Sequence, residues 1–259
     1  MGENRKRGEK VMRGFVLQLS ENGHYSTEVA TVEDAISARN WFRPDEKLEV
    51  AEYSYEDITK ENTEGFIPVG SVQFVNKVLS FYGKEPMKPT NIPECLREEK
   101  FLSRKIAFAK NREEIDKIKA DWNAKHVFIK SNTGVKQWTP ELYTGKDILP
   151  EDTEYFVSEH ANFVSEWRCF VYRGELRGIK HYLDDEWIMP SKDFINDCIK
   201  AMGNTMPAYT LDVGVLPNGK TAVIEVHNFV SCGLYGFEDC ILIPMLTNAF
   251  KYELNKKPD

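Results

Sequence analysis

The segment Thr210–Asn228, which reads TLDVGVLPNGKTAVIEVHN, constrains the fold more than any other part of the chain. Two runs of apolar and β-branched residues flank Asn218-Gly219. An Asn-Gly pair between such runs predicts a β-hairpin with a two-residue loop, because both turn residues must adopt positive φ. That loop places Asp212 directly opposite Glu225, and the other face of the hairpin then carries only apolar residues, namely Leu211, Val213, Val215, Ala222, Ile224 and Val226.

The two opposed carboxylates of this hairpin need an explanation. Like charges directly opposite each other destabilise a sheet or raise one pKa. A divalent cation between them would remove the repulsion, since carboxylate oxygens are hard ligands; two solvated acids on an open sheet face are the alternative. Because the repulsion would be lost, we expect Asp212→Asn or Glu225→Gln to leave the fold intact, or to stabilise it when metal is absent. His227 falls on the same face, and Asn228 lies just beyond it.

Composition narrows the class of protein. A chain of 259 residues is long for one hydrophobic core, which predicts two closely packed lobes and a small extra unit. The net charge of −7 gives no electrostatic attraction to nucleic acid or to a membrane. The sequence shows neither an apolar run of transmembrane length nor a signal peptide. Five cysteines without CxxC spacing indicate free thiols in a reducing cytoplasm rather than a zinc site.

The N-terminal third predicts a small α/β unit. Residues 1–12 are polar and basic, and we interpret them as a disordered tail. Strands and helices alternate from there to residue 82, which favours some parallel strand pairing. The predicted strands are 14–19, 48–53 and 66–69, and the predicted helices begin at Thr31 and Ser71. Three prolines within residues 84–94 mark a boundary.

The remainder of the chain predicts mostly antiparallel strands. They are expected at 105–109, 126–130, 154–159, 163–172 and 175–183, besides the hairpin described first. Arg173-Gly174 is the expected turn between two of them, and it places Glu166, Arg168, Arg177 and His181 on one face. Helices are expected at 112–122, from the Ser191 cap to Met202, and at 241–254.

Two further groups of residues could carry chemistry. Lys130 ends an apolar strand and precedes a loop of small residues that contains Lys136, which suits phosphate binding; two surface lysines are the alternative. Glu166 and Arg168 lie two apart on one strand, where Arg168 could bind a phosphate or a carboxylate, or form an internal salt bridge. Lysines, an arginine and paired carboxylates together supply what nucleotide-dependent phosphoryl transfer needs.

From about residue 92 onward the chain resembles the ATP-grasp proteins, in particular a small bacterial and bacteriophage clade related to the ribosomal-protein glutamate ligases. The segments that carry the resemblance are FIK at 128–130 with Lys136, FVSEH at 156–160, SEWRCFVYRGELRGIKHY at 165–182, TLDVGV at 210–215 and IEVHNFVSCGLYGF at 224–237. The resemblance implies an α+β fold in which two lobes grip ATP, preceded by a small α/β domain. The implied domains are residues 13–93, an N-terminal lobe at 94–158 and a C-terminal lobe at 159–259.

The same resemblance implies roles for individual residues. Lys130 and Lys136 would contact the phosphates of ATP, and Arg168 would meet the γ-phosphate or an acyl phosphate. The hinge residues Phe156, Val157, Ser158 and Glu159 would lie against the adenine, with Glu159 near the ribose. Asp212 and Glu225 would bind Mg²⁺. ATP-grasp proteins usually have Asn two residues after that Glu, whereas this chain has His227 followed by Asn228. Asn228 or water would then complete the metal site, and His227 would act as a substitute ligand or on the substrate.

The implied reaction is ATP-dependent ligation of a carboxylate to an amine through an acyl phosphate, with a peptide, protein or amino acid as substrate. Two alternatives stay open: a kinase that uses the same site, and a nucleotide-binding switch module that never turns over. By analogy with relatives the chain could form a homodimer. The implied partners include neither nucleic acid nor membrane.

Overall fold

A computed structural model of the protein describes residues 12–238 and 240–256, so the predicted tail at residues 1–12 lies outside the described residues apart from Met12. The chain divides into two compact units, Met1–Glu85 with Cys240–Asp259 and Pro86–Asp239. The last helix therefore groups with the N-terminal unit, although we predicted it as part of a lobe at 159–259. Both predicted ATP-binding lobes otherwise fall within the second unit, and their exact boundaries stay a prediction.

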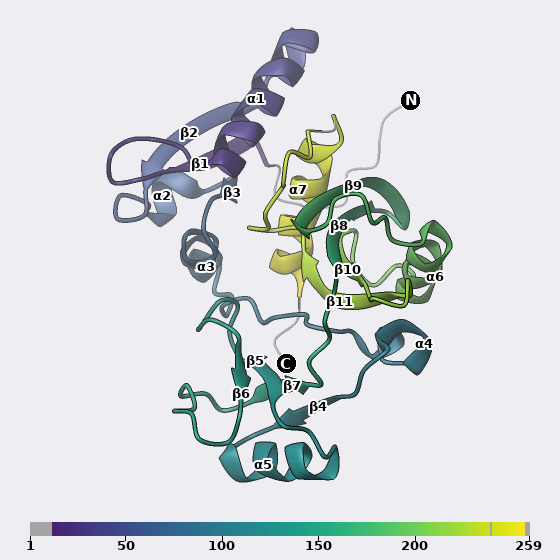
Figure 1. Ribbon diagram of the computed structural model, residues 1–259. Helices are drawn as coiled ribbons and strands as arrows, with labels where there is room; N and C mark the ends of the chain where they lie inside the picture. Colours follow the sequence, from purple (N-terminus) through teal and green to yellow (C-terminus); the bar gives the residue numbers. More distant parts are fainter. Residues whose placement is uncertain (1–11, 239, 257–259) are drawn as a thin grey trace. The chain divides into compact units, whose positions relative to one another are not determined.

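A parallel three-stranded sheet forms the centre of the first unit (Figure 1). Its strands are β1 (Gly14–Leu19), β2 (Glu49–Ser54) and β3 (Phe66–Val69), in the order β2-β1-β3. The helices are α1 (Thr27–Phe42), α2 (Lys60–Thr63), α3 (Val72–Phe81) and α7 (Leu242–Asn255), and α7 contacts α1 and β3. The predicted α/β unit with parallel pairing is confirmed. The predicted start of α1 at Thr31 is wrong, because Ser26 accepts a hydrogen bond from the Val29 N–H and caps the helix earlier.

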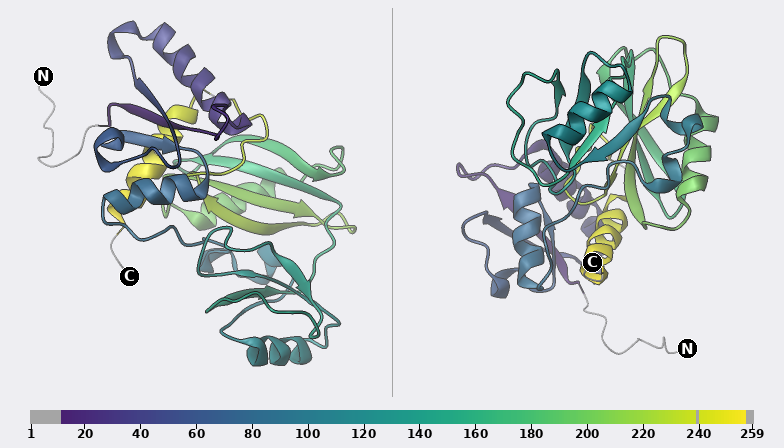
Figure 2. Two further views of the ribbon diagram at one scale, coloured as in Figure 1. Left: turned by 90° about the vertical axis from the view of Figure 1, so that its left-hand side faces the viewer. Right: turned by 90° about the horizontal axis from the view of Figure 1, so that it is seen from below.

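The second unit contains two antiparallel sheets, and the first of them lies beside α5 (Figure 2). It has the order β4-β7-β5-β6. Its strands are β4 (Ile106–Ala109), β5 (Val127–Ser131), β6 (Glu141–Tyr143) and β7 (Tyr155–Ser158), and the helices of this part are α4 (Glu99–Leu102) and α5 (Arg112–Asp121). Asn111 caps α5, and Ile115 of α5 packs into a buried cluster with Val127, Ile129 and Val157 of the sheet. The amphipathic helix and the apolar strand faces thus share one core, which fixes the end of β5 where Lys130 lies.

The second sheet has the order β11-β10-β8-β9 and is antiparallel throughout. Its strands are β8 (Ser165–Tyr172), β9 (Glu175–Asp184), β10 (Ala208–Val215) and β11 (Thr221–Asn228). Helix α6 (Lys192–Met202) begins after the predicted Ser191 cap, whose side chain accepts from the Phe194 N–H. The central strands β8 and β10 carry most of the polar groups that matter below, because both flanks of each are paired and their side chains are buried.

The loop of the β10–β11 hairpin is longer than predicted. Leu216 donates to the Lys220 carbonyl at 2.8 Å, and Gly219 donates to the Leu216 carbonyl at 2.8 Å, so the two-residue loop is wrong. A β-bulge next to Asp212 compensates for the difference, and Asp212 pairs with Glu225 as predicted. Beyond the bulge Val213 pairs with Val223 and Gly214 with Ala222, so the predicted placing of Ala222 and Ile224 on the apolar face is also wrong.

The β8–β9 hairpin has the predicted two-residue turn, with φ of 51° at Arg173 and 75° at Gly174. Two bulges follow it, and they change the predicted face. Lys180, rather than His181, is the cross-strand partner of Arg168, whereas His181 lies opposite Trp167. Bulges of this kind leave no signal in the alternation of polar and apolar residues, so the register beyond them could not be read from the sequence.

Candidate active site

A buried ion pair lies at the centre of the candidate site. Arg168 of β8 and Asp212 of β10 are cross-strand partners in register. The guanidinium donates from Nε to Oδ1 at 2.8 Å and from Nη2 to Oδ2 at 2.6 Å, and both residues are buried. Its remaining Nη1 donates to the Gly233 carbonyl at 3.0 Å. Such a bidentate pair is geometrically rigid, so β8, β10 and the loop after β11 are held together at one point.

A second ion pair joins the two sheets of this unit. Lys130, from the end of β5, donates to Oε2 of Glu225 on β11 at 2.5 Å. The other carboxylate oxygen, Oε1, lies 2.6 Å from Nε2 of His227. Burial disfavours the charged form of Glu225, but His227 and Lys130 outweigh it and hold the pKa of that carboxyl well below its usual range. The opposed carboxylates of the hairpin therefore each have a cationic partner of their own.

Three candidate metal ligands converge at this place. One ligand atom from each of Asp212, Glu225 and His227 lies within 4.8 Å of the others. The structure does not bring Asn228 into this group, because strand alternation turns residue 228 to the other face of β11. Its Oδ1 accepts from the Val230 N–H at 3.2 Å, and its Nδ2 lies 3.6 Å from the Met87 sulfur. His227 is accordingly the third member that the geometry offers, where we predicted Asn228.

The two predicted phosphate-binding lysines differ in position. Lys130 lies inside the site, with Nζ 5.1 Å from the centre of the Phe156 ring. Lys136 is exposed and has a positive φ of 53°, and the structure gives it no hydrogen bond or ion pair within the described ranges. The N–H groups of Thr133 and Gly134 both donate to Oγ of Ser131, at 3.3 and 3.2 Å. The loop thus satisfies its own backbone, and its predicted role in phosphate binding stays a prediction.

The predicted hinge lies at the end of a strand. Phe156, Val157 and Ser158 belong to β7, whose main chain pairs with β4 on one side and β5 on the other, and all three side chains are buried. Glu159 follows the strand, and Oε2 accepts from the Lys105 N–H at 2.8 Å. The Glu159 N–H in turn donates to the Lys105 carbonyl at 3.0 Å. A contact of these residues with adenine or ribose stays a prediction, although the reciprocal bonds fix the direction of the Glu159 carboxylate.

Several residues of the site were not anticipated. Arg104 donates to the Val223 carbonyl at 2.6 Å and the Ile224 carbonyl at 3.1 Å, so it holds the bulge that precedes Glu225. Burial lowers the pKa of Arg104 to about 10. Tyr182 and Tyr235 stack with ring centres 5.1 Å apart, and the Arg168 guanidinium lies 5.0 Å from the centre of the Tyr235 ring. Nothing in the spacing along the sequence relates Arg104 to a strand more than a hundred residues later.

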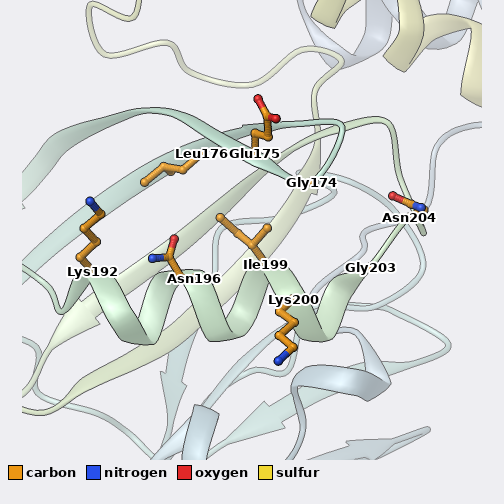
Figure 3. A pocket seen from close by; sticks show the side chains of 9 residues that line it. All are labelled: Gly174, Glu175, Leu176, Lys192, Asn196, Ile199, Lys200, Gly203 and Asn204. Carbon is orange, nitrogen blue, oxygen red and sulfur yellow. The ribbon is translucent and has the colours of Figure 1, made fainter.

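An open cavity of about 670 Å³ lies elsewhere in this unit, between α6 and the β8–β9 turn (Figure 3). Figure 3 shows Glu175 and Leu176 on one side and Lys192, Asn196 and Ile199 on the helix facing them. None of the candidate residues lines it. We place the chemistry at the ion pairs rather than in this cavity, because only there do charged groups converge.

The sequence profile of a family described as an ATP-grasp domain, the second family of its clade, matches residues 101–241, which is more than half of the chain. The chain belongs to this ATP-grasp family. The match spans both sheets of the second unit and includes the predicted site residues from Lys130 to Asn228. The family resemblance inferred from the sequence, and the α+β ATP-grasp fold it implied, are confirmed.

Solved structures of other ATP-grasp proteins share the fold of this chain. A D-alanine–D-alanine ligase from Bacillus anthracis has a TM-score of 0.55 at 12% identity, with 94% of this chain and 99% of that chain covered. A RimK domain ATP-grasp protein from Sphaerobacter thermophilus DSM 20745 has a TM-score of 0.55 at 14% identity, with 93% and 99% covered. The ATP-grasp ligase PsnB, in complex with a variant precursor, Mg and ADP, has a TM-score of 0.55 at 13% identity, with 95% and 100% covered.

A search of curated protein sequences finds no match. In the part of the chain that the structure describes, none of the helices has the length and apolar character that crossing a membrane requires. All five cysteines are free thiols, in agreement with the sequence-based expectation.

Proposed function

We propose that this ATP-grasp protein is an ATP- and Mg²⁺-dependent ligase that joins a carboxylate to an amine. The observation that carries the proposal is the convergence of Lys130, Arg168, Asp212 and Glu225 from strands of two sheets. Two cations and two carboxylates at one place match the charges of a nucleotide triphosphate and its metal ion. Solved relatives named as ligases, one of them in complex with Mg and ADP, support the same interpretation.

The chemistry follows from the poor reactivity of a carboxylate. Its oxygen attacks the γ-phosphorus of ATP, the bond to the β-phosphate oxygen breaks, and ADP leaves. The amine nitrogen then attacks the carbonyl carbon of the acyl phosphate, inorganic phosphate leaves, and the amine loses a proton to give an amide. We infer that Lys130 and Arg168 bind and orient the phosphates and offset the charge that develops on them, which lowers the barrier by positioning and electrostatics.

The residues present fit a magnesium ion. Asp212 and Glu225 provide carboxylate oxygens on adjacent strands, and His227 lies within the same group of ligand atoms. When bound, Mg²⁺ would bridge and neutralise phosphate oxygens. Because Lys130 and Arg168 now pair with these carboxylates, we infer that they exchange partners when nucleotide and metal enter, each cation to phosphate and each carboxylate to metal. The ion pairs of the structure thus hold the site in place without ligand.

Replacing Lys130 with alanine is expected to raise the Kd for ATP roughly 10- to 100-fold, because a charge-assisted hydrogen bond of about 1.5–3 kcal/mol is lost. Isothermal titration calorimetry with Mg²⁺ and a non-hydrolysable ATP analogue measures the change. The matched control is Lys125→Ala, since Lys125 is exposed and lies just before the same strand. Equal affinity of the Lys130→Ala variant and the control would remove Lys130 from the phosphate site.

Replacing His227 with asparagine is expected to keep ADP release within roughly tenfold of the unmodified protein, the smaller end of the effects seen for changes beside a metal. The reason is that an amide oxygen is a harder ligand than imidazole and suits Mg²⁺ better. Asparagine is also the residue that ATP-grasp proteins usually have at this place. A loss beyond roughly a hundredfold with unchanged ATP affinity would instead assign the imidazole to the substrate.

ADP release tests the proposed function itself. Release in the presence of Mg²⁺ should require both a carboxylate and an amine, supplied as pools of N-acetylated amino acids or peptides and of amino-acid amides. Release with a hydroxyl compound in place of the amine, and with the phosphate retained on the product, would identify a kinase. ATP binding without turnover for every pool would identify a switch module. We further propose a peptide, protein or amino-acid substrate, because PsnB is described with a peptide precursor.

A further inference from the structure

Glu166 lies at the centre of the site but has no part in the chemistry described so far. It is two residues from Arg168 on β8, so the two side chains leave the same face of the strand. Its cross-strand neighbours are Gly214 on β10 and Leu183 on β9. A Cβ at Gly214 would lie 2.3 Å from the Phe163 ring, so Phe163 occupies the space that a side chain opposite Glu166 would take.

A count of charges on this face sets Glu166 apart. Asp212 pairs with Arg168, and Glu225 pairs with Lys130. Within residues 12–238 and 240–256, the structure shows no ion pair at Glu166. Tyr182, a neutral group, donates a hydrogen bond to it.

Arg104 is near enough for its charge to act on Glu166, but its Nη1 and Nη2 both donate to main-chain carbonyls of β11. Burial, together with the charges of Asp184, Asp212 and Glu225, disfavours the ionised form of Glu166 and raises its pKa. A half-buried carboxylate among like charges costs free energy unless a cation pairs with it. Since the described part of the fold supplies no such cation, the pairing group has to come from a ligand.

We propose that Glu166 binds the ammonium group of the amine substrate and holds it beside Arg168, where the acyl group would be activated. The proposal rests on the proposed ligase function and names one substrate class for it: an amine that is protonated in solution. Glu166 acts on binding and orientation of the cation, whereas Arg168 and Lys130 serve the phosphates. Acid and base residues of this face thus divide the two substrates between them.

The test compares a cationic with a neutral nucleophile. With N-acetylated amino acids and peptides as the carboxylate pool, glycinamide is the cationic probe, and hydroxylamine is a nucleophile that is largely neutral at pH 7. The Glu166→Gln variant is expected to raise the ratio of KM for glycinamide to KM for hydroxylamine at least about tenfold, the effect of losing one charge-assisted hydrogen bond. Glu186→Gln is the matched control, because Glu186 is exposed beyond the end of β9 and carries the same charge.

An unchanged ratio in the Glu166→Gln variant would overturn the proposal, and an equal fall in the use of both nucleophiles would assign Glu166 to the metal or the phosphates instead. Absence of both amide and hydroxamate in the unmodified protein would count against the ligase function, not against Glu166 alone. Thermal unfolding without any substrate gives a second readout. The Glu166→Gln variant should melt at the same temperature as the unmodified protein or higher, whereas a lower Tm would reveal an internal partner and refute the proposal.

Discussion

Replacing Glu225 with glutamine is expected to lower Mg²⁺-dependent ADP release at least about 100-fold, the size of effect that follows loss of one preorganised electrostatic group. The amide keeps the shape of the side chain and can still form a hydrogen bond, but it removes one of the two negative charges that would hold the metal. Glu225 also pairs with Lys130 and His227, so the change leaves both cations without their carboxylate. ADP release as a function of Mg²⁺ concentration measures the effect.

The matched control for this variant is Glu175→Gln, since Glu175 is an exposed acid at the β8–β9 turn of the same sheet. Circular dichroism of both variants establishes that the fold is retained. Unchanged turnover of the Glu225→Gln variant across the magnesium range would remove Glu225 from the metal site, and the proposed mechanism with it.

Replacing Asp212 with asparagine is expected to destabilise the second unit by about 3–5 kcal/mol, the cost of breaking a buried ion pair by removing one partner. Arg168 is buried and donates two hydrogen bonds to Asp212, and the neutral amide would leave its charge without compensation. Urea unfolding in the absence of Mg²⁺ and ATP measures the change in free energy of unfolding. This result would be the opposite of the sequence-based expectation, which was that loss of a like-charge repulsion leaves the fold intact or stabilises it.

The double variant Asp212→Asn/Arg168→Met separates the two accounts of stability. If the ion pair is responsible, the double variant should lose less free energy of unfolding than the sum of the two single variants, because the second change removes the unpaired charge. Additive losses, or an Asp212→Asn variant as stable as the unmodified protein, would show that the pair contributes nothing in solution.

Much of the fold could be predicted from local patterns. The strands that begin at Gly14 and Phe66 and the cap at Ser191 agree with the structure, since apolar runs and capping residues act locally. The cross-strand pairing of Asp212 with Glu225 was also predicted correctly, but for an incomplete reason. The loop is longer than Asn218-Gly219, and a bulge shifts the register back by the same amount.

The partners of the charged residues could not be predicted, because they depend on distances between strands that are far apart in the chain. Lys130 and Glu225 are separated by 95 positions, and Arg168 and Asp212 by 44. The sequence therefore showed two carboxylates that repel each other, whereas each has a cation of its own in the folded chain. Placing Asn228 at the metal failed for a local reason, since alternation along β11 turns it away from Glu225 and His227.

A crystal structure of the protein with Mg²⁺ and a non-hydrolysable ATP analogue tests the central claim most directly. We predict that Lys130 leaves Glu225 and contacts a phosphate, and that the carboxylates of Asp212 and Glu225 coordinate the metal ion. A nucleotide bound elsewhere, with the Lys130–Glu225 and Arg168–Asp212 pairs both intact, would contradict the proposal that these residues form the ATP site.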